Sequence, residues 1–321
     1  VLILITPLGS SSQATIIHVP DDQPTIQAGI DVAFDGDTVL VAPGTYTGSG
    51  NTNVNFLGKA IFVTSEMGPD STIVDAEGIV AYRFIFNNGE TRSSVLNGFT
   101  LTHFASAIYI RESSPQIVNC RMVDCGGAYI DGGGMYIRYG SPLILNCSFK
   151  RCYLNPGIGG AISSVSSNPS IINSEFILCG AYIYGPDAAV HCDDALIVNC
   201  SFYNNSFYTI IGNPVVINCI FWESDWGDIW GNADVSYSDI EEGWPGEGNI
   251  HEDPLFVDPE NENLNLSPDS PCIDAGDPNS PNVPWGGFRR DMGAFEFDQG
   301  FFWNGQCIIL KPFPIEMPSV R

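Results

Sequence analysis

Apolar and polar residues alternate along this chain in short segments that are separated by Gly, Pro, Asn, Asp and Ser. One segment type recurs, in which a polar residue and usually Pro precede a run of Ile, Leu or Val that ends in Asn and Cys. Its asparagines are separated by 27, 27, 26 and 19 residues. The copies lie at 114–120, 141–147, 168–174, 194–200 and 213–219, with a divergent copy at 232–238. Self-similarity at such a period predicts a solenoid, in which each repeat is one turn of a stack.

The segment before the repeats has another pattern. Residues 16–20 read as a strand, and residues 24–33 place Ile26, Ile30 and Ala33 on one face of a short helix. Because a stack of turns exposes its core at each end, we expect this helix to act as a cap.

From residue 253 onward the repeat pattern gives way to Asp-, Pro-, Asn- and Ser-rich turns, which indicate a cap at the other end. The predicted organisation is a single domain, 15–297, that divides into an N-terminal cap at 15–53, coils at 54–252 and a C-terminal cap at 253–297, followed by a tail at 298–321 without a clear pattern.

Two segments outside the repeats resemble a known family. Residues 15–80 contain Val-Pro-Asp-Asp-Gln-Pro-Thr-Ile-Gln-Ala-Gly-Ile-Asp and Gly-Asp-Thr-Val-Leu-Val-Ala-Pro-Gly-Thr-Tyr. Residues 253–297 contain Asp-Pro-Leu-Phe-Val-Asp-Pro, Ser-Pro-Cys-Ile-Asp-Ala-Gly-Asp and Asp-Met-Gly-Ala-Phe-Glu-Phe. They resemble the two ends of pectin-lyase-like proteins of the secreted bacterial type. The resemblance implies an all-β, right-handed parallel β-helix and leaves the activity open.

In that family each turn has three strands, PB1, PB2 and PB3, and an asparagine ladder at the bend between PB2 and PB3. The resemblance therefore implies that the Ile- and Val-rich segment is PB2 and that Cys-x-Phe, as at 147–149, is PB3. PB1 then lies eight to eleven residues before each ladder Asn. We expect the asparagines themselves to be structural, because stacked amides bond along the column and tolerate a left-handed backbone.

The outward positions of PB1 carry the candidate chemistry. Ten residues before each Asn stand Tyr109, Tyr136, Ser163, Ala189 and Tyr208, and eight before stand Arg111, Arg138, Val165, His191 and Ile210. Tyrosine faces stack on sugar rings and Arg matches carboxylates. The predicted ligand strip is formed by Tyr109, Arg111, Tyr136, Arg138, Tyr139 and His191. The alternative is ordinary sheet surface, in which aromatic neighbours only stabilise the strands.

Some of these residues are also catalytic candidates. A polysaccharide lyase needs a base and a cationic group near the uronate, for which Arg138 and His191 are candidates. Asp193 and Asp194 are candidates for calcium ligands, or for part of the carboxyl pair of an inverting glycosidase. The Asn-Thr-Asp, Gly-His-Gly and Arg-Ile-Lys motifs of polygalacturonases are absent from the chain, which argues against a galacturonan hydrolase.

Charge narrows the range of partners. The chain has 12 Lys and Arg against 37 Asp and Glu, a formal net charge of -25, which argues against nucleic acid and anionic membranes. A polyanionic glycan needs a bridging cation here, so we expect a neutral or calcium-bridged polysaccharide. The candidate calcium ligands are Asp35, Asp37, Asp274 and Asp277, each of which is also a common turn-forming residue.

Residues 1–14 begin with an apolar run and end in small residues, as the tail of a secretory signal does; an apolar first strand is the alternative. No other apolar run approaches the ~20 residues that span a bilayer. The prediction is a secreted, extracellular or cell-surface protein without membrane insertion.

The ten cysteines follow the repeat. Stacked strands lie about 4.8 Å apart, whereas a disulfide needs Cβ atoms about 3.8 Å apart and converging. We therefore expect most of the cysteines to be free, small and buried.

Two hypotheses remain for the function. In the first, PB1 binds extracellular or cell-surface polysaccharide, with or without lyase or glycosidase activity. In the second, the solenoid is a non-catalytic structural or adhesive surface protein that self-associates.

Overall fold

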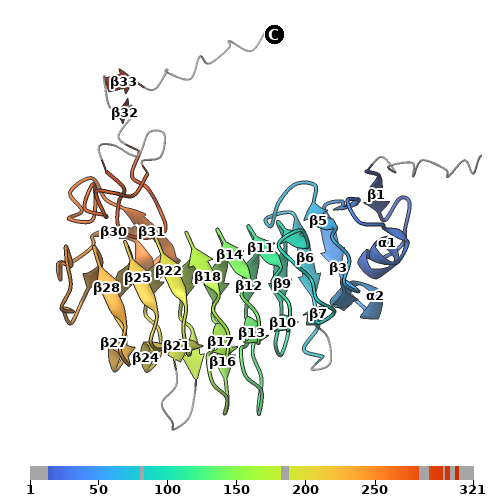
Figure 1. Cartoon of the computed structure of the whole chain (residues 1–321), viewed down its shortest axis with the longest axis horizontal. Coiled ribbons are helices and arrows are strands. Elements are labelled where there is room, and N and C mark those ends of the chain that lie inside the picture. Colours follow the sequence, from blue (N-terminus) through green and yellow to red (C-terminus); the bar gives the residue numbers. More distant parts are fainter. Residues whose placement is uncertain are drawn as a thin grey trace, which may run out of the picture.

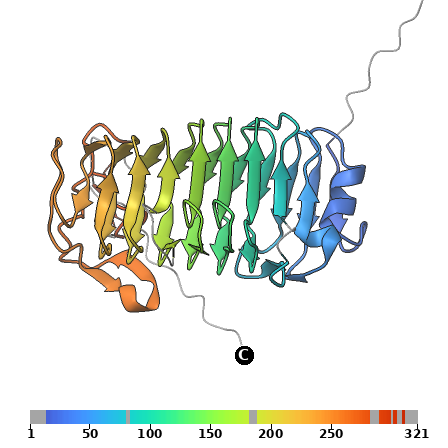
Figure 2. The ribbon, with the colours of Figure 1, turned by 90° about the horizontal axis from the view of Figure 1, so that it is seen from below.

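The chain folds as a solenoid of three parallel sheets with irregular ends (Figures 1 and 2). A computed structural model describes residues 14–79, 83–181, 188–281 and 289–298, together with the backbone of 301–303 and 308–310. Most of the predicted signal remnant, 1–14, and of the tail, 298–321, lies outside the described residues. Within the described residues, no helix combines the length and apolar character that crossing a membrane requires.

The three sheets correspond to PB2, PB3 and PB1. The PB2 sheet comprises β1 (Ile16–Val19), β2 (Thr38–Val41), β5 (Phe62–Ser65), β8 (Val95–Asn97), β11 (Gln116–Val118), β14 (Leu143–Leu145), β18 (Ser170–Ile172), β22 (Leu196–Val198), β25 (Val215–Ile217) and β28 (Asp234–Ser236). The PB3 sheet comprises β3 (Gly44–Tyr46), β6 (Thr72–Asp75), β9 (Thr100–Thr102), β12 (Arg121–Val123), β15 (Ser148–Lys150), β19 (Glu175–Ile177), β23 (Ser201–Tyr203), β26 (Ile220–Trp222) and β29 (Asp239–Ile240). The PB1 sheet comprises β4 (Asn53–Asn55), β7 (Arg83–Phe86), β10 (Ile108–Arg111), β13 (Met135–Arg138), β17 (Ile162–Val165), β21 (Ala188–Cys192), β24 (Tyr208–Gly212) and β27 (Gly227–Trp230). The predicted fold class is confirmed.

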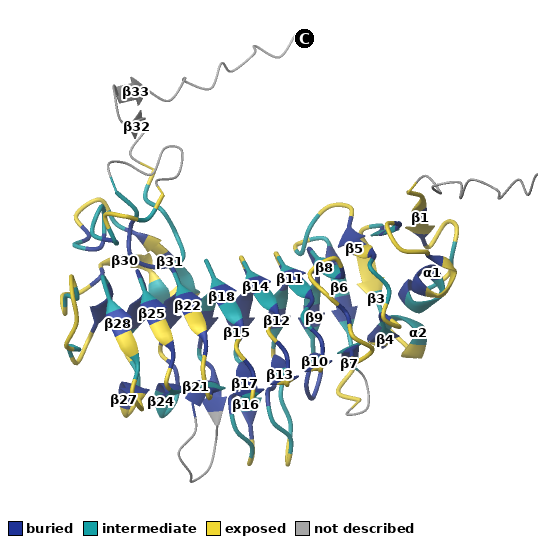
Figure 3. Ribbon diagram, viewed as in Figure 1, coloured by how far each residue is buried: buried dark blue, intermediate teal, exposed yellow. Residues whose placement is uncertain are grey.

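The core is built from columns of inward side chains. Phe149, Phe176, Phe202 and Phe221 stack with ring centroids 4.7, 4.7 and 4.6 Å apart and planes within 10° of parallel. Each ring is fully buried, because alternate residues of every strand face the interior. Figure 3 shows this buried interior along the three sheets, with the exposed residues concentrated at turns and ends.

The asparagine ladder lies at the predicted bend. Its members adopt left-handed backbone angles, with φ between 50° and 56° from Asn119 to Asn218. The Nδ2 of Asn119 donates to Oδ1 of Asn97 at 2.8 Å, and the Nδ2 of Asn146 donates to Oδ1 of Asn119 at 3.2 Å. These two bonds link the amide groups of three successive turns, as expected for a ladder.

The cysteines of the described chain are free and buried, which confirms the interpretation drawn from their spacing. Their thiols donate to nearby carbonyl groups, as Cys147 Sγ does to the carbonyl oxygen of Leu145 at 3.4 Å. They act as small core residues.

The N-terminal end of the stack is covered by α1 (Ile26–Val32), which is followed by the short helix α2 (Ser49–Thr52). Thr25 caps α1 by accepting a hydrogen bond from the backbone N–H of Ala28 at 3.2 Å. Ile26, Ile30 and Ala33 are buried, so the predicted apolar face of the helix is confirmed.

The C-terminal residues fold back over the PB3 sheet (Figure 1). They include β30 (Phe256–Asp258), η1 (Pro259–Asn261) and β31 (Asn263–Leu266). Leu264 packs with Ile177 and Tyr203, and the N–H of Ala294 donates to Ser201 Oγ at 2.9 Å. Smaller two-stranded sheets join β16 (Tyr153–Leu154) to β20 (Gly180–Ala181), and β32 (Phe301–Trp303) to β33 (Ile308–Leu310).

The phenylalanine column predicts a large effect of truncation. Phe176→Ala removes a ring that is packed between two others, so we expect the free energy of unfolding to fall by about 3–5 kcal/mol in urea denaturation. Phe34→Ala is the control, because Phe34 is 75% exposed, and it should change stability by less than about 0.5 kcal/mol. Equal effects of the two substitutions would contradict the role of the column.

Candidate functional site

The PB1 sheet is flanked by loops that enter each of its strands. The loops at 126–134 and 153–160 lie side by side, since Ile158 N–H donates to Asp131 Oδ1 at 3.0 Å and Gly132 N–H donates to the carbonyl oxygen of Ile158 at 3.1 Å. A Cβ atom at Gly132 would lie 2.0 Å from the carbonyl oxygen of Met135, so the chain needs glycine where it turns into β13. These loops form a wall beside the outward PB1 residues.

Tyr109 and Tyr136 form a stacked pair on this face. The two residues are direct register partners, and their ring centroids lie 5.8 Å apart with an interplanar angle of 14°. The guanidinium of Arg83 lies 5.5 Å from the centroid of the Tyr109 ring. A pocket of about 180 Å³ is lined by the two tyrosines and Arg83, together with Ser106, Ile130 and Asp131. The predicted tyrosine column is therefore present at this position and adjoins a concave surface.

The two predicted arginines lie beside the tyrosines, but each has a partner in its own turn. Arg111 Nε lies 3.2 Å from Oε1 of Glu112. Arg138 lies 4.8 Å from the centroid of the Tyr139 ring and donates to the Tyr139 hydroxyl at 3.1 Å. Both guanidinium groups face outward, so they can still donate hydrogen bonds to a ligand.

His191 does not lie in the arginine column where the count from Asn199 placed it. The register pairs Ile162 with Val190 and Ser163 with His191, so the imidazole follows the tyrosines in their own column. The reason is that the connection from PB1 to PB2 is two residues shorter in this turn: Ser163 stands ten residues before Asn173, whereas His191 stands eight before Asn199.

The surroundings of His191 are apolar and acidic. Burial lowers the pKa of its imidazole, while the carboxylates of Asp193 and Asp131 act in the opposite direction. Its Nδ1 is buried and has no hydrogen-bond partner, and the same holds for the hydroxyl of its register neighbour Ser163. Both atoms are buried below the surface of the PB1 sheet, so neither is exposed on its outer face.

Asp193 and Asp194 lie at the bend after β21. Asp193 Oδ2 accepts a hydrogen bond from the backbone N–H of Ser166 at 2.6 Å, which ties this turn to the preceding one. Both aspartates line a shallow pocket of about 620 Å³ with Tyr139 and several serines. The predicted residues are therefore brought to one side of the solenoid, but the aspartates lie at the edge of the tyrosine and histidine column.

A second aromatic group lies at the C-terminal end of the PB1 sheet. Trp226 and Trp230 are 60% and 50% exposed, and Tyr208 stacks against Trp230 with centroids 5.7 Å apart and planes 19° from parallel. Phe207 meets Trp226 edge to face at 4.6 Å. Tyr208 was expected in the column of Tyr109, but it pairs in register with Ala188 and Gly227. Counting back from the ladder asparagines did not identify the two tryptophans. The last turn has Tyr237 at its ladder position in place of Asn, so there was no Asn from which to count.

A buried polar network supports this aromatic group. The Thr209 and Ser224 hydroxyls are 2.5 Å apart, and Ser224 Oγ donates to Asp228 Oδ1 at 2.9 Å. Burial raises the pKa of Asp228 to about 7. The carboxyl group lies in β27 between Trp226 and Trp230, so its protonation is coupled to the stability of this end.

The four aspartates predicted as calcium ligands lie in turns. Asp37 accepts hydrogen bonds from the N–H groups of Thr15 and Phe34, and these bonds lower its pKa. Asp35 accepts a hydrogen bond from the backbone N–H of Ala60. In the same way, Asp274 accepts one from the backbone N–H of Arg289, and Asp277 accepts one from the backbone N–H of Asn279. In the described ranges no group of three or more His, Cys, Asp or Glu residues has the arrangement of a metal site. A calcium role for these residues stays a prediction.

Asp228 gives rise to a pH-dependent prediction. Its folded pKa lies above the usual value near 3.9, so the native state binds more protons than the unfolded state between about pH 4 and 7. Stability contributed by this group is therefore lost as the pH rises through that window. We expect Asp228→Asn to raise the melting temperature at pH 8 relative to the wild type, with a smaller gain at pH 5.

The control for this experiment is Asp225→Asn, which removes an exposed carboxylate from the segment just before β27. Differential scanning calorimetry from pH 4 to 8 would measure both variants. A gain for Asp228→Asn that does not change with pH would contradict the coupling.

A comparison with protein families agrees with the fold. Residues 83–239 match the family model of the right-handed β-helix region, from the first residue of β7 to the first residue of β29. A comparison with curated proteins gave no match. Among solved structures, the chain is similar to the pectate lyase Pel9A at 13% identity and a TM-score of 0.36, with 89% of this chain and 97% of that chain covered. With its three parallel sheets and the matched region at its centre, the chain is a right-handed parallel β-helix protein.

Proposed function

We propose that this protein binds a neutral or calcium-bridged extracellular polysaccharide along the outer face of the PB1 sheet. The observation that carries the proposal is one register column that runs from the tyrosine pair to the tryptophans. It consists of Tyr109, Tyr136, Ser163, His191, Ile211 and Trp230. Five register steps at about 4.8 Å span about 24 Å, which suits a linear polymer better than a single small molecule.

Both ends of the column offer aromatic faces, whereas Ser163 and Ile211 in its middle are buried. Flat aromatic rings bury a large apolar area with little loss of conformational freedom, and sugar rings present matching apolar faces. Between them, the Ser163 hydroxyl and His191 Nδ1 have no protein partner. Both atoms are buried, so the proposed contacts with a saccharide come from the aromatic ends of the column.

Charge favours a neutral chain. The net charge of -25 repels polyanions, and Arg111 and Arg138 already contact Glu112 and Tyr139. An anionic polymer would have to compete with these contacts, unless calcium bridged it to the protein. The proposal implies a location outside the cell.

Binding is proposed here without bond cleavage. Asp193 accepts a backbone hydrogen bond at a turn, and His191 Nδ1 has no protein partner that would orient the imidazole as a base. Roles of Arg138, His191, Asp193 and Asp194 in a lyase or glycosidase stay predictions, which an assay for released unsaturated or reducing sugars would test.

The aromatic ends of the column should control affinity. We expect Tyr136→Ala and Trp230→Ala each to weaken binding to the best ligand of a glycan array by about 30-fold, because truncation of an aromatic anchor typically costs about 2 kcal/mol. Affinity electrophoresis in gels that contain that polysaccharide would measure the change. Phe62→Ala is the control, because Phe62 is an exposed aromatic residue on the PB2 sheet.

Unchanged retention of both variants would contradict the proposal. A protein that bound no glycan and formed concentration-dependent assemblies would instead support the structural or adhesive alternative.

A further inference from the structure

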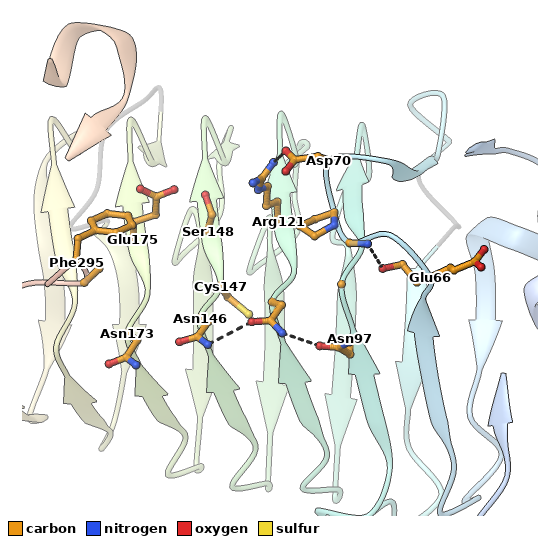
Figure 4. A pocket seen from close by; sticks show the side chains of 16 residues that line it. Glu66, Asp70, Asn97, Arg121, Asn146, Cys147, Ser148, Asn173, Glu175 and Phe295 are labelled. Atoms are coloured by element: carbon orange, nitrogen blue, oxygen red, sulfur yellow. Dashed lines mark hydrogen bonds and ion pairs between the residues drawn. The ribbon is translucent and has the colours of Figure 1, made fainter. Parts of the chain in front are cut away.

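A groove of about 640 Å³ lies on another side of the solenoid, over the bend between PB2 and PB3 (Figure 4). Its floor is the asparagine column from Asn97 to Asn173, together with the outward residues of β12, β15 and β19. One end is closed by residues 65–70 and the other by Ala294 and Phe295. Two distant parts of the chain thus leave an open section of the PB3 face between them.

The Ser148 hydroxyl lies in this section without a partner. Ser148 is 7% exposed, lines the groove, and its Oγ makes no hydrogen bond. Its register neighbours on either side are Arg121 and Glu175. Both charged side chains already have ion-pair partners, since Arg121 pairs with Asp70 and Glu175 lies 3.0 Å from Lys150 Nζ. A buried hydroxyl without a partner costs about 1–3 kcal/mol, and a ligand atom could satisfy it.

The asparagine ladder is interrupted at the same place. Asn146 donates to Asn119, and Asn199 donates to Asn173 at 3.0 Å. Among the described residues, no hydrogen bond joins Asn173 to Asn146, and Figure 4 shows the two amides side by side without a link. Asn173 Nδ2 thus remains as a donor and Asn146 Oδ1 as an acceptor, and both residues line the groove. One ligand hydroxyl can accept from the first and donate to the second.

The lining limits the chemistry of the ligand. Glu66, Asp70 and Glu175 outnumber Arg121, so the groove disfavours anions. The lining atoms without a hydrogen-bond partner among the described residues include Ser148 Oγ, Asn173 Nδ2 and Asn146 Oδ1, and Phe295 adds an aromatic side chain at one end. A neutral molecule with many hydroxyl groups matches this combination of hydrogen-bonding and apolar surface.

We infer that the groove is a second binding site, which takes a neutral saccharide segment on a side of the solenoid separate from PB1. It uses none of the PB1 residues and does not depend on the function proposed for them.

The test uses backbone amide NMR shifts of the full chain, titrated with four neutral hexasaccharides: cellohexaose, mannohexaose, xylohexaose and galactohexaose. We expect at least one of them to shift the amides of Gly98 and Ala294, which line the groove. The amides of Tyr136 and Trp230 report separately on PB1. Ser148→Ala should weaken the groove response about tenfold, as the loss of one hydrogen bond of about 1.4 kcal/mol predicts, and Ser148→Thr should retain it.

Thermal unfolding separates binding from folding. Because the Ser148 hydroxyl has no protein partner, Ser148→Ala should keep or raise the melting temperature. Ser163→Ala is the matched control, since it removes another buried, unpartnered hydroxyl but from the PB1 face, and it should leave the groove response unchanged.

Two results would overturn the inference. One is that none of the four hexasaccharides shifts Gly98 and Ala294. The other is that the response persists in Ser148→Leu, whose larger side chain extends into the groove. Loss of the PB1 response alone would contradict only the function proposed for PB1.

Discussion

Constant register between parallel strands is the constraint on which this structure depends. Hydrogen bonds between successive turns hold equivalent residues about 4.8 Å apart, so each position of the turn becomes a column of side chains. Inward columns become stacked rings, as in Phe149 to Phe221, and each stacked pair adds about 0.5–1.5 kcal/mol to the burial of its area. Outward columns become lines of equivalent side chains. The core and the outer face of each sheet therefore follow from one geometric rule.

The same rule explains what the sequence could predict. Counting from the ladder asparagines located PB1 correctly at Tyr109 and Tyr136, because the connection from PB1 to PB2 keeps its length in those turns. The count failed where that connection shortens, by two residues at His191 and by three at Ile211, which stands seven before Asn218. A bend absorbs such deletions because its residues lie outside the strands, although backbone hydrogen bonds, such as that from the Asn168 N–H to the Gly140 carbonyl oxygen, still join the bends of successive turns.

The repeat pattern did not indicate other parts of the PB1 face and of the groove over the PB2–PB3 bend. Trp230 joins the PB1 column through a turn whose ladder position is Tyr237, so no Asn marked its register. The walls of the PB2–PB3 groove come from residues 65–70 and 294–295, which are far apart in the chain. Their meeting depends on how the ends fold back over PB3, and local periodicity contains no information about that.

In the site inferred for the groove, the asparagine column is both scaffold and binding surface. An amide whose donor and acceptor are both used along the column presents little to a ligand, because a new hydrogen bond would have to replace an existing one. Where the column is interrupted, between Asn146 and Asn173, the same side chains keep their positions but have free capacity. Pre-organised groups of this kind bind with little ordering cost, so an interruption in a stable column is a favourable place for recognition.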